Sequence, residues 1–115
     1  MRKQIGQLGE DKAVQFLKVK GYSILHRNYR TRFGELDIVC QDQHSLVFIE
    51  VKTRTSIKFG YPEEAITYQK IKHVKKAAAI YINNEQKRFS EVRFDVVTVL
   101  KSNSKWIINH IENAF

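Results

Sequence analysis

The amino-acid sequence predicts an α/β protein whose elements follow one another in the order α-β-β-β-α-β-β. Two stretches carry apolar residues at helical spacing, and an apolar hairpin lies between them. A stretch rich in Val and Phe over residues 91–100 predicts a further strand. At 115 residues, with 43% hydrophobic and 11% aromatic residues, the chain has the size and composition of one compact domain. We therefore expect a single domain over residues 1–115, with a mixed central sheet flanked by helices.

The first helix and the first three strands are expected in the N-terminal half. An amphipathic helix is predicted over residues 4–20 and ended by Gly21, because apolar side chains recur at helical spacing at Ile5, Leu8, Ala13, Phe16 and Leu17. A weakly patterned strand over residues 22–29 follows. The hairpin then supplies strands over residues 34–40 and 46–52. These three strands should form an antiparallel meander.

The second helix is expected after a polar, basic loop over residues 53–60. Pro62 suits the first turn of a helix, so this helix should run from there to Asn84. Its inward face is predicted to hold Ile66, Val74, Ala77, Ala78 and Tyr81. Its outer face carries a cluster of lysines, Lys72, Lys75 and Lys76. After this helical crossover, strands over residues 91–100 and 106–111 complete the order.

Charge and composition restrict the partners and the compartment. The chain has 20 Lys and Arg against 12 Asp and Glu, a net charge of +8, so nucleic acid is the simplest expected partner. No stretch approaches the roughly 18 apolar residues of a membrane span, and no apolar signal region opens the chain. We therefore expect a cytoplasmic protein with no membrane partner. The single cysteine, Cys40, excludes an internal disulfide and is predicted to be a small buried side chain.

Two acids lie inside the otherwise apolar hairpin. If its turn is centred between Gln43 and His44, Asp37 falls directly opposite Glu50, with the β-carbons about 5 Å apart. The same register makes every flanking pair apolar, namely Leu36 with Val51, Ile38 with Ile49, Val39 with Phe48, and Cys40 with Val47. Like charges opposite each other destabilise a sheet, and buried unpaired charge destabilises it further. A divalent cation between the carboxylates would remove this repulsion, so the pair predicts a metal site.

The residues around the acid pair suit hydrolysis at such a metal. Mg²⁺ takes oxygen ligands, usually one or two carboxylates with waters and substrate phosphates, and Asp37 and Glu50 supply two carboxylates. A bound metal polarises a phosphate and lowers the pKa of its bound water. Lys52 shares a face with Glu50, where it could orient or deprotonate that water or stabilise developing negative charge. Glu10 could add a ligand if the first helix packs against this face.

The same residues also have plainer interpretations. Glu35 falls opposite Lys52 in this register, so these two could form an ordinary cross-strand ion pair. Glu10, near a helix start, could serve only the helix dipole. The four histidines show no zinc-ligand spacing and are expected to be structural or exposed. Basic residues could line a path for phosphates or form a solvated surface, and they are Arg30, Arg32, Arg54, Lys58, Lys72 and Lys76.

Several short motifs match one known family. The strongest are Gly34-Glu35-Leu36-Asp37 and the run Val47-Phe48-Ile49-Glu50-Val51-Lys52-Thr53-Arg54. Weaker ones extend the match over nearly the whole chain, namely Gly9-Glu10, Gly21-Tyr22, Arg27-Asn28, Phe59-Gly60, Arg93-Phe94-Asp95-Val96-Val97 and Ala114-Phe115. In combination they resemble the YraN family of small bacterial proteins. That family is identified as a member of the PD-(D/E)xK nuclease superfamily and is similar to archaeal Holliday-junction resolvases.

The resemblance implies a restriction-endonuclease-like fold and a requirement for Mg²⁺ or Mn²⁺. Asp37 takes the place of the superfamily's metal-binding Asp, and Glu50 and Lys52 take the Glu-x-Lys positions. Glu10 matches the first-helix acid of the resolvase branch, which would make it a third metal ligand. Leu36 stands where the superfamily has proline, which many members also lack. The resolvases are dimers, so the resemblance also implies a homodimer.

Two functions follow as hypotheses. The first is a metal-dependent endonuclease that hydrolyses phosphodiester bonds in DNA, with branched or junction DNA as the candidate substrate. Its catalytic residues would be Asp37, Glu50, Lys52 and Glu10. The alternative is a nucleic-acid-binding module that keeps the nuclease scaffold and performs no chemistry. A purely protein-binding role, in which the charge finds an acidic partner, stays open as a third.

Overall fold

The computed structural model describes residues 2–55 and 66–115. The predicted order of elements is confirmed, and the elements are α1 (Arg2–Val19), β1 (Ser23–Thr31), β2 (Gly34–Asp42), β3 (Ser45–Arg54), α2 (Tyr68–Asn84), β4 (Glu91–Ser102) and β5 (Lys105–Ile111). None of the helices in the described ranges is long and apolar enough to cross a membrane.

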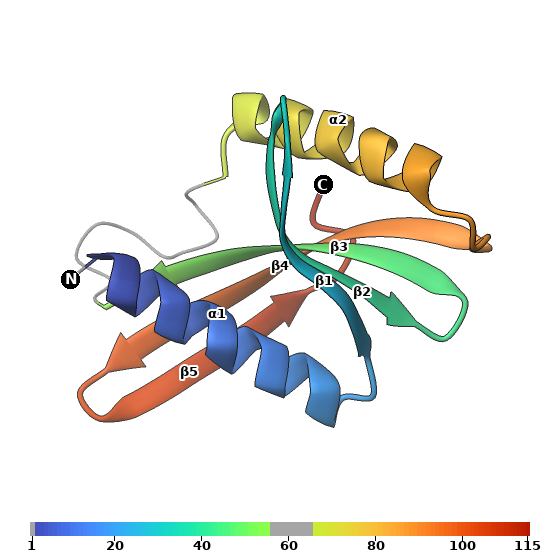
Figure 1. Cartoon of the computed structure of the whole chain (residues 1–115). Coiled ribbons are helices and arrows are strands. Elements are labelled where there is room, and N and C mark those ends of the chain that lie inside the picture. Colours follow the sequence, from blue (N-terminus) through green and yellow to red (C-terminus); the bar gives the residue numbers. More distant parts are fainter. Residues whose placement is uncertain (1, 56–65) are drawn as a thin grey trace.

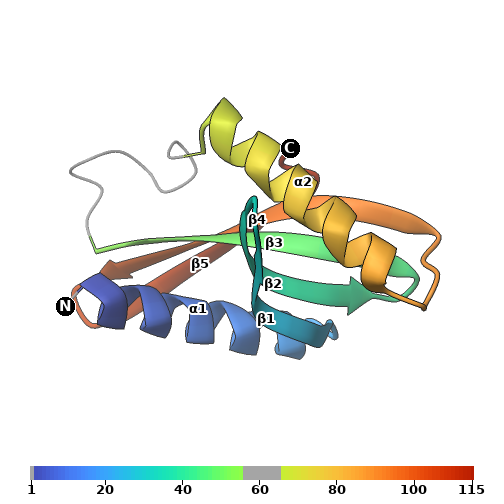
Figure 2. The same ribbon diagram turned by 45° about the horizontal axis from the view of Figure 1, so that its top comes forward.

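The strands form one mixed sheet in the order β1-β2-β3-β4-β5. The first three strands make the predicted antiparallel meander, β4 runs parallel to β3, and β5 returns antiparallel to β4. The two helices cover opposite faces of this sheet, as Figures 1 and 2 show. The arrangement is mixed α/β and compatible with a restriction-endonuclease-like fold.

The helix α1 packs on one face of the sheet through small and aliphatic side chains. Its buried residues Ala13, Val14 and Leu17 join a core with the α1-facing residues of three strands, Ile38, Cys40, Val47, Ile49, Val97 and Val99. Gly9 lies so close to β3 that an added β-carbon would overlap the Thr53 side chain. Glycine at this position therefore lets α1 approach the end of β3, the strand that carries Glu50 and Lys52.

The helix α2 starts later than its sequence pattern predicts. Thr67 is extended and its hydroxyl accepts a hydrogen bond from the Lys70 N–H at 3.1 Å, so the helix begins at Tyr68. The predicted start at Pro62 lies outside the described residues, and Ile66 precedes the helix instead of facing inward from it. The other inward residues are confirmed as buried, namely Val74, Ala77, Ala78 and Tyr81.

The strand β3 continues further than expected. Its parallel ladder with β4 extends to the pair Arg54–Leu100, so residues 53 and 54 belong to the strand and not to the predicted loop. The reason is the partner strand: β4 is long enough to satisfy the backbone of these polar residues. Cys40 is fully buried and its thiol donates to the Val47 carbonyl, as expected of a structural cysteine. Burial raises the pKa of this thiol to about 12.

Candidate metal and nucleic-acid site

The site forms where β2 leaves β3. The predicted register is confirmed in the ladder, which pairs Ile38 with Ile49, Val39 with Phe48, and Cys40 with Val47. The ladder ends at Ile38, so the predicted ladder pairs of Leu36 with Val51 and Asp37 with Glu50 are not formed. The cause is Leu36, which packs into the α2-side core together with Val39, while the start of β2 pairs only with β1. Figure 1 shows the β1–β2 hairpin rising beside α2 after this bend.

Asp37 lies at the bend and turns its carboxyl group toward β3. Its Oδ2 accepts a hydrogen bond at 2.9 Å from the Val51 N–H, a backbone donor that β2 no longer reaches. Burial and then the charge of Glu50 raise the pKa of Asp37 to about 7, against the opposing effects of the Val51 N–H and Lys70. The two acids therefore form a close pair, in which a proton on Asp37 relieves the repulsion near neutral pH.

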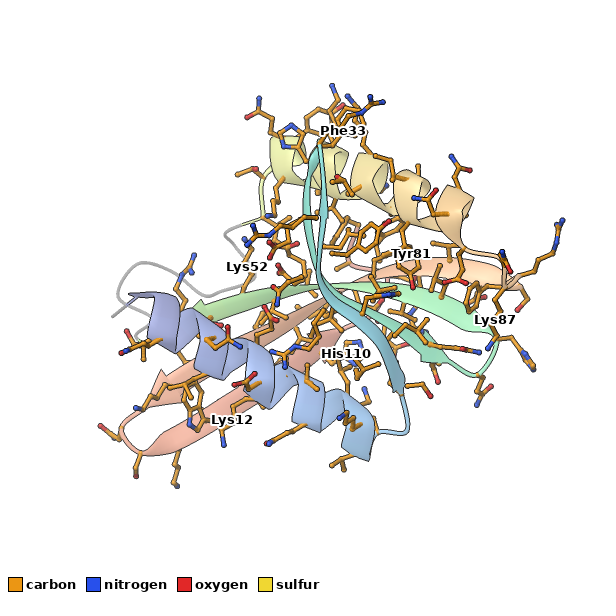
Figure 3. The ribbon with its side chains drawn as sticks, in the orientation of Figure 1. Lys12, Phe33, Lys52, Tyr81, Lys87 and His110 are labelled. Atoms are coloured by element: carbon orange, nitrogen blue, oxygen red, sulfur yellow. The ribbon has the colours of Figure 1, made fainter. Side chains whose placement is uncertain are left out.

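Two ammonium groups face the second acid of the pair. The Glu50 side chain is only 4% exposed, and its Oε1 lies 3.3 Å from the Nζ of Lys70 and 3.9 Å from the Nζ of Lys52. Lys52 projects from β3 on the face that α2 covers, with its side chain 18% exposed (Figure 3). Lys70 comes from the first turns of α2. The buried charge of Glu50 is thus balanced from two different elements.

Lys70 was not among the predicted site residues. It lies 18 positions after Lys52 along the chain, on another element, so the hairpin pattern contains no trace of it. A signal was nevertheless present, because Lys70 falls on the same helical stripe as the inward residues Val74, Ala77 and Tyr81. A lysine on an apolar stripe needs a buried acid as partner, and Glu50 is that acid.

Glu10 lies near the pair but is held by β1. Its side chain is 13% exposed, and its Oε1 accepts hydrogen bonds from Arg27 Nη2 at 3.1 Å and Asn28 Nδ2 at 3.0 Å. Burial raises the pKa of Glu10; Arg27 opposes this rise, and the charge of Asp37 adds to it. As a metal ligand Glu10 would first have to release Arg27.

The alternative ion pair of Glu35 with Lys52 is not formed between these described residues. Glu35 Oε2 instead accepts from Arg30 Nε at 3.1 Å on the exposed side of the hairpin, and Lys52 faces Glu50. The bend of β2 is again the reason, since it carries Glu35 away from β3 and along β1. Lys52 therefore contacts the buried acid Glu50 and does not form a surface salt bridge with Glu35.

The predicted basic residues lie in several different parts of the molecule. Around the β1–β2 turn and α2, Arg32 and Lys76 both lie over the Phe33 ring, and Lys72 lies over the Tyr68 ring. Arg54, at the end of β3, donates to its neighbour's carbonyl and lines a cavity beside the start of α1. Arg30 is paired with Glu35. Lys58 lies outside the described residues.

The donor set fits a hard cation. Within residues 2–55 and 66–115 no three side chains of His, Cys, Asp or Glu converge into a ready-made metal cluster. Mg²⁺ and Mn²⁺ do not require one, because they accept one or two carboxylates and complete their shells with water and substrate oxygens. Asp37 and Glu50 would hold such an ion, whereas the thiolate and imidazole ligands of structural zinc are missing from these two positions.

Comparison with known sequences gives the family. A sequence model described as "Uncharacterised protein family UPF0102" matches residues 9–99. The UPF0102 protein of Syntrophomonas wolfei is 51% identical over 115 residues, covering 100% of both chains. Those of Caldicellulosiruptor saccharolyticus and Dictyoglomus turgidum are 47% and 44% identical, and the alignments cover 99% and 98% of this chain and 98% of each relative. The chain belongs to the UPF0102 family.

UPF0102 is the YraN family, so the resemblance read from the motifs is confirmed. The matched range of this UPF0102 protein contains the whole site described above, from Glu10 to Lys70. Motif reasoning therefore found the family, whereas the hairpin pattern had singled out Asp37, Glu50 and Lys52 as candidates. The contact of Lys70 with Glu50 and the pairing of Glu10 with Arg27 come only from the folded chain.

A second polar cluster of the UPF0102 protein lies buried beneath α1. Asp95 is fully buried and accepts hydrogen bonds from Arg93 Nε at 3.0 Å, the Asn113 N–H at 3.0 Å and His110 Nε2 at 2.7 Å. Arg93 also donates to the Tyr22 hydroxyl at 2.6 Å. Burial opposes the charge of Asp95, but the bonds from His110 and Arg93 hold its pKa below the usual value. With its bonds satisfied, the cluster is a structural clamp between β4, β5 and the segment that joins α1 to β1.

The histidines behave as expected. His110 belongs to this clamp, and His26 Nδ1 lies 2.8 Å from the Tyr81 hydroxyl. His44 and His73 are exposed. None of the four lies in contact with the acid pair among the described hydrogen bonds and ion pairs.

Proposed function

We propose that this UPF0102 protein is a metal-dependent endonuclease that hydrolyses phosphodiester bonds in DNA, with branched or junction DNA as its substrate class. The observation that carries the proposal is the buried pair of Asp37 and Glu50, faced by Lys52 and Lys70. Two acids in mutual repulsion destabilise a fold, so their placement in the core calls for a compensating role. Binding of a divalent cation is such a role.

Each residue of the site would have its own role in the reaction. Mg²⁺ or Mn²⁺ on Asp37 and Glu50 would supply polarisation of the scissile phosphate and a bound water of lowered pKa. Lys52, 3.9 Å from Glu50, would orient the attacking water or stabilise the negative charge that develops on the phosphate oxygens. Lys70 balances Glu50 in the metal-free protein and would turn toward the phosphate once a cation takes over that role. Glu10 would add a ligand only after releasing Arg27.

The charge of the molecule supports nucleic acid as the partner. The net charge is +8, and basic residues lie at the β1–β2 turn and along the exposed side of α2, the helix whose Lys70 contacts Glu50. A polyanion is attracted to such a surface before any specific contact is made. The proposed DNA strand would approach the acid pair across the start of α2.

The test is a cleavage assay on defined DNA structures. Wild type and the variants Glu50→Gln and Lys52→Met would each be incubated with labelled DNA in the presence of Mg²⁺, Mn²⁺ or EDTA. The substrates would be duplex, nicked, forked, four-way-junction and single-stranded DNA. We expect metal-dependent cutting by the wild type and a loss of roughly 100-fold or more in each variant, because each removes a charge from the reacting centre. Glu35→Gln is the matched control, since it removes an acid from the exposed side of the same hairpin.

Two results would contradict the proposal. Undiminished cutting by purified Glu50→Gln would show that the activity comes from elsewhere. Absence of cutting on every substrate, with DNA binding retained, would favour the alternative of a non-catalytic binding module.

We further propose that the protein forms a homodimer through β5. This strand ends the sheet, and its outer edge offers unpaired backbone groups to another strand. Ile107 and Ile111 lie on the same face of the strand and are both exposed. If two copies pair antiparallel about Asn109, Ile107 of each copy falls opposite Ile111 of the other and both become covered.

A further inference from the structure

One exposed aromatic side chain lies at the start of α2, the helix that supplies Lys70 to the acid pair. Among the Phe, Tyr and Trp residues of 2–55 and 66–115, Tyr68 alone is exposed, with 76% of its surface accessible to solvent. It is the first residue of α2, two positions before Lys70, whose ammonium group touches Glu50. The Tyr68 ring belongs to neither of the two hydrophobic cores, so packing does not explain why a large aromatic side chain stands at this position.

Tyr68 begins a line of cations and rings along α2. Tyr68, Lys72 and Lys76 are spaced four residues apart and therefore share one face of the helix, over a length of about 12 Å. The Lys72 Nζ lies 5.8 Å from the centre of the Tyr68 ring. We call this face, together with the β1–β2 turn that it meets, the α2 ridge.

The far end of the α2 ridge is formed by the β1–β2 turn. The Lys76 Nζ lies 5.2 Å from the centre of the Phe33 ring, and the Arg32 guanidinium carbon lies 4.9 Å from it. Figure 3 shows Phe33 at the tip of the hairpin beside α2. The ridge thus presents an aromatic ring, two lysines, a second ring and an arginine in sequence.

We propose that the α2 ridge binds unpaired bases of a nucleic-acid strand, with a base stacked on Tyr68 and with Lys72, Lys76 and Arg32 on the phosphates. The inference deepens the proposed function and rests on it for the choice of nucleic acid as partner. A ring flanked by cations offers stacking and charge together, which is how proteins bind single strands without sequence preference. The base faces inside a duplex are covered by their neighbours, so a duplex gains from the cations but not from the ring. Single-stranded and forked DNA are therefore the preferred class.

The experiment measures stacking directly and without metal. A single-stranded oligonucleotide containing 2-aminopurine, whose fluorescence falls when the base stacks, would be titrated with protein in EDTA. The same measurement on a blunt duplex would report binding without free bases. Wild type should quench the single strand, and Tyr68→Ala should weaken single-strand binding roughly 10-fold while changing duplex binding less than about 2-fold. Tyr68→Phe, which keeps the ring, should bind as wild type does.

Two controls separate this site from general effects. Ile82→Ala, a change to another exposed apolar residue of α2 at its far end, should leave both titrations unchanged. Lys72→Met should weaken single-strand and duplex binding alike, because phosphates are common to both.

Three outcomes would overturn the proposal, namely unchanged binding by Tyr68→Ala, an equal loss on single strand and duplex, or no binding of either DNA by wild type. Failure of cleavage with normal 2-aminopurine quenching would instead reject the endonuclease and leave the ridge in place.

Discussion

Asp37 holds a carboxyl group where burial and a neighbouring acid both oppose its charge. Its pKa of about 7 is raised well above that of an aspartate in an unfolded chain, which is near 3.9. Between these two values the folded protein binds a proton that the unfolded chain has lost. The stability contributed by this group is therefore fully present below about pH 4 and is lost as the pH rises through 7.

The loss of stability with rising pH gives a prediction for Asp37→Asn in metal-free buffer. The amide cannot ionise, so the variant should be more stable than wild type at pH 8 by about 1–4 kcal/mol, and the gain should shrink toward pH 5. Urea unfolding of both proteins in EDTA at the two pH values measures this difference. Asp11→Asn, at a more exposed acid of α1 that pairs with Arg27, is the control. A gain that is the same at pH 5 and pH 8 would contradict the assignment of the shift to Asp37.

The same residue shows why stability and the proposed activity oppose each other. A carboxylate pair that binds a cation keeps two acids close together when the cation is absent, and the metal-free fold depends on Lys52, Lys70 and a proton on Asp37 to offset their repulsion. The clamp around Asp95 is the contrasting case in the same sheet. There an acid is buried even more deeply, but Arg93, His110 and the Asn113 N–H satisfy it permanently.

At the scale of elements, α2 brings a second positive charge, that of Lys70, next to Glu50. Val74, Ala77 and Tyr81 anchor the helix on the sheet, and this anchoring places Lys70 against Glu50 at 3.3 Å. In the metal-free protein the lysine acts as an internal cation. It therefore competes with any divalent ion for the acid pair.

Lys70→Met should consequently tighten divalent metal binding. Removal of one positive charge a few ångströms from the acids should lower the dissociation constant for Mn²⁺ about tenfold, which corresponds to roughly 1.4 kcal/mol. Titration of Mn²⁺ followed by electron paramagnetic resonance or calorimetry gives the constant without any cleavage reaction. Lys75→Met removes the same charge from an exposed position of α2 and should change little. Equal constants in the two variants would show that Lys70 does not oppose the cation.

At the scale of the whole molecule, the two ends of the sheet differ. The edge formed by β1 carries arginines whose partners are acids, whereas the edge formed by β5 carries the exposed side chains of Ile107 and Ile111. An apolar, unprotected edge favours pairing with another strand. In an antiparallel arrangement of two copies this pairing would leave both acid pairs free.

The proposed dimer leads to the last prediction. Sedimentation velocity of the wild type should show a concentration-dependent dimer, and Ile107→Lys together with Ile111→Lys should convert it to a monomer, because like charges then face each other across the twofold axis. Ile82→Lys, which adds a charge elsewhere on the surface, is the control and should leave the dimer intact. A wild type that stays monomeric at every concentration would reject pairing through β5.

Local patterns in the sequence were sufficient for the order of elements, for the inward face of α2 and for the hairpin register from Ile38 to Cys40. Each depends on periodicity or on a turn between adjacent strands, and such information lies within a few residues along the chain. The candidate acids and Lys52 were found for the same reason, since all three stand in one hairpin. The family motifs then added an expected chemistry for these positions, which rests on the resemblance.

The folded chain alone decided the bend at Asp37, the approach of Lys70 and the capture of Glu10 by Arg27. Each of these features brings together residues that are 14 to 20 positions apart and on different elements, so they depend on how the elements pack in the folded chain. The start of α2 was mispredicted for a related reason, because Pro62 and Thr67 both suit a helix start and only Thr67 caps the described helix. Periodicity identifies which side chains are buried. Packing determines which buried charges meet, and the proposed chemistry depends on that meeting.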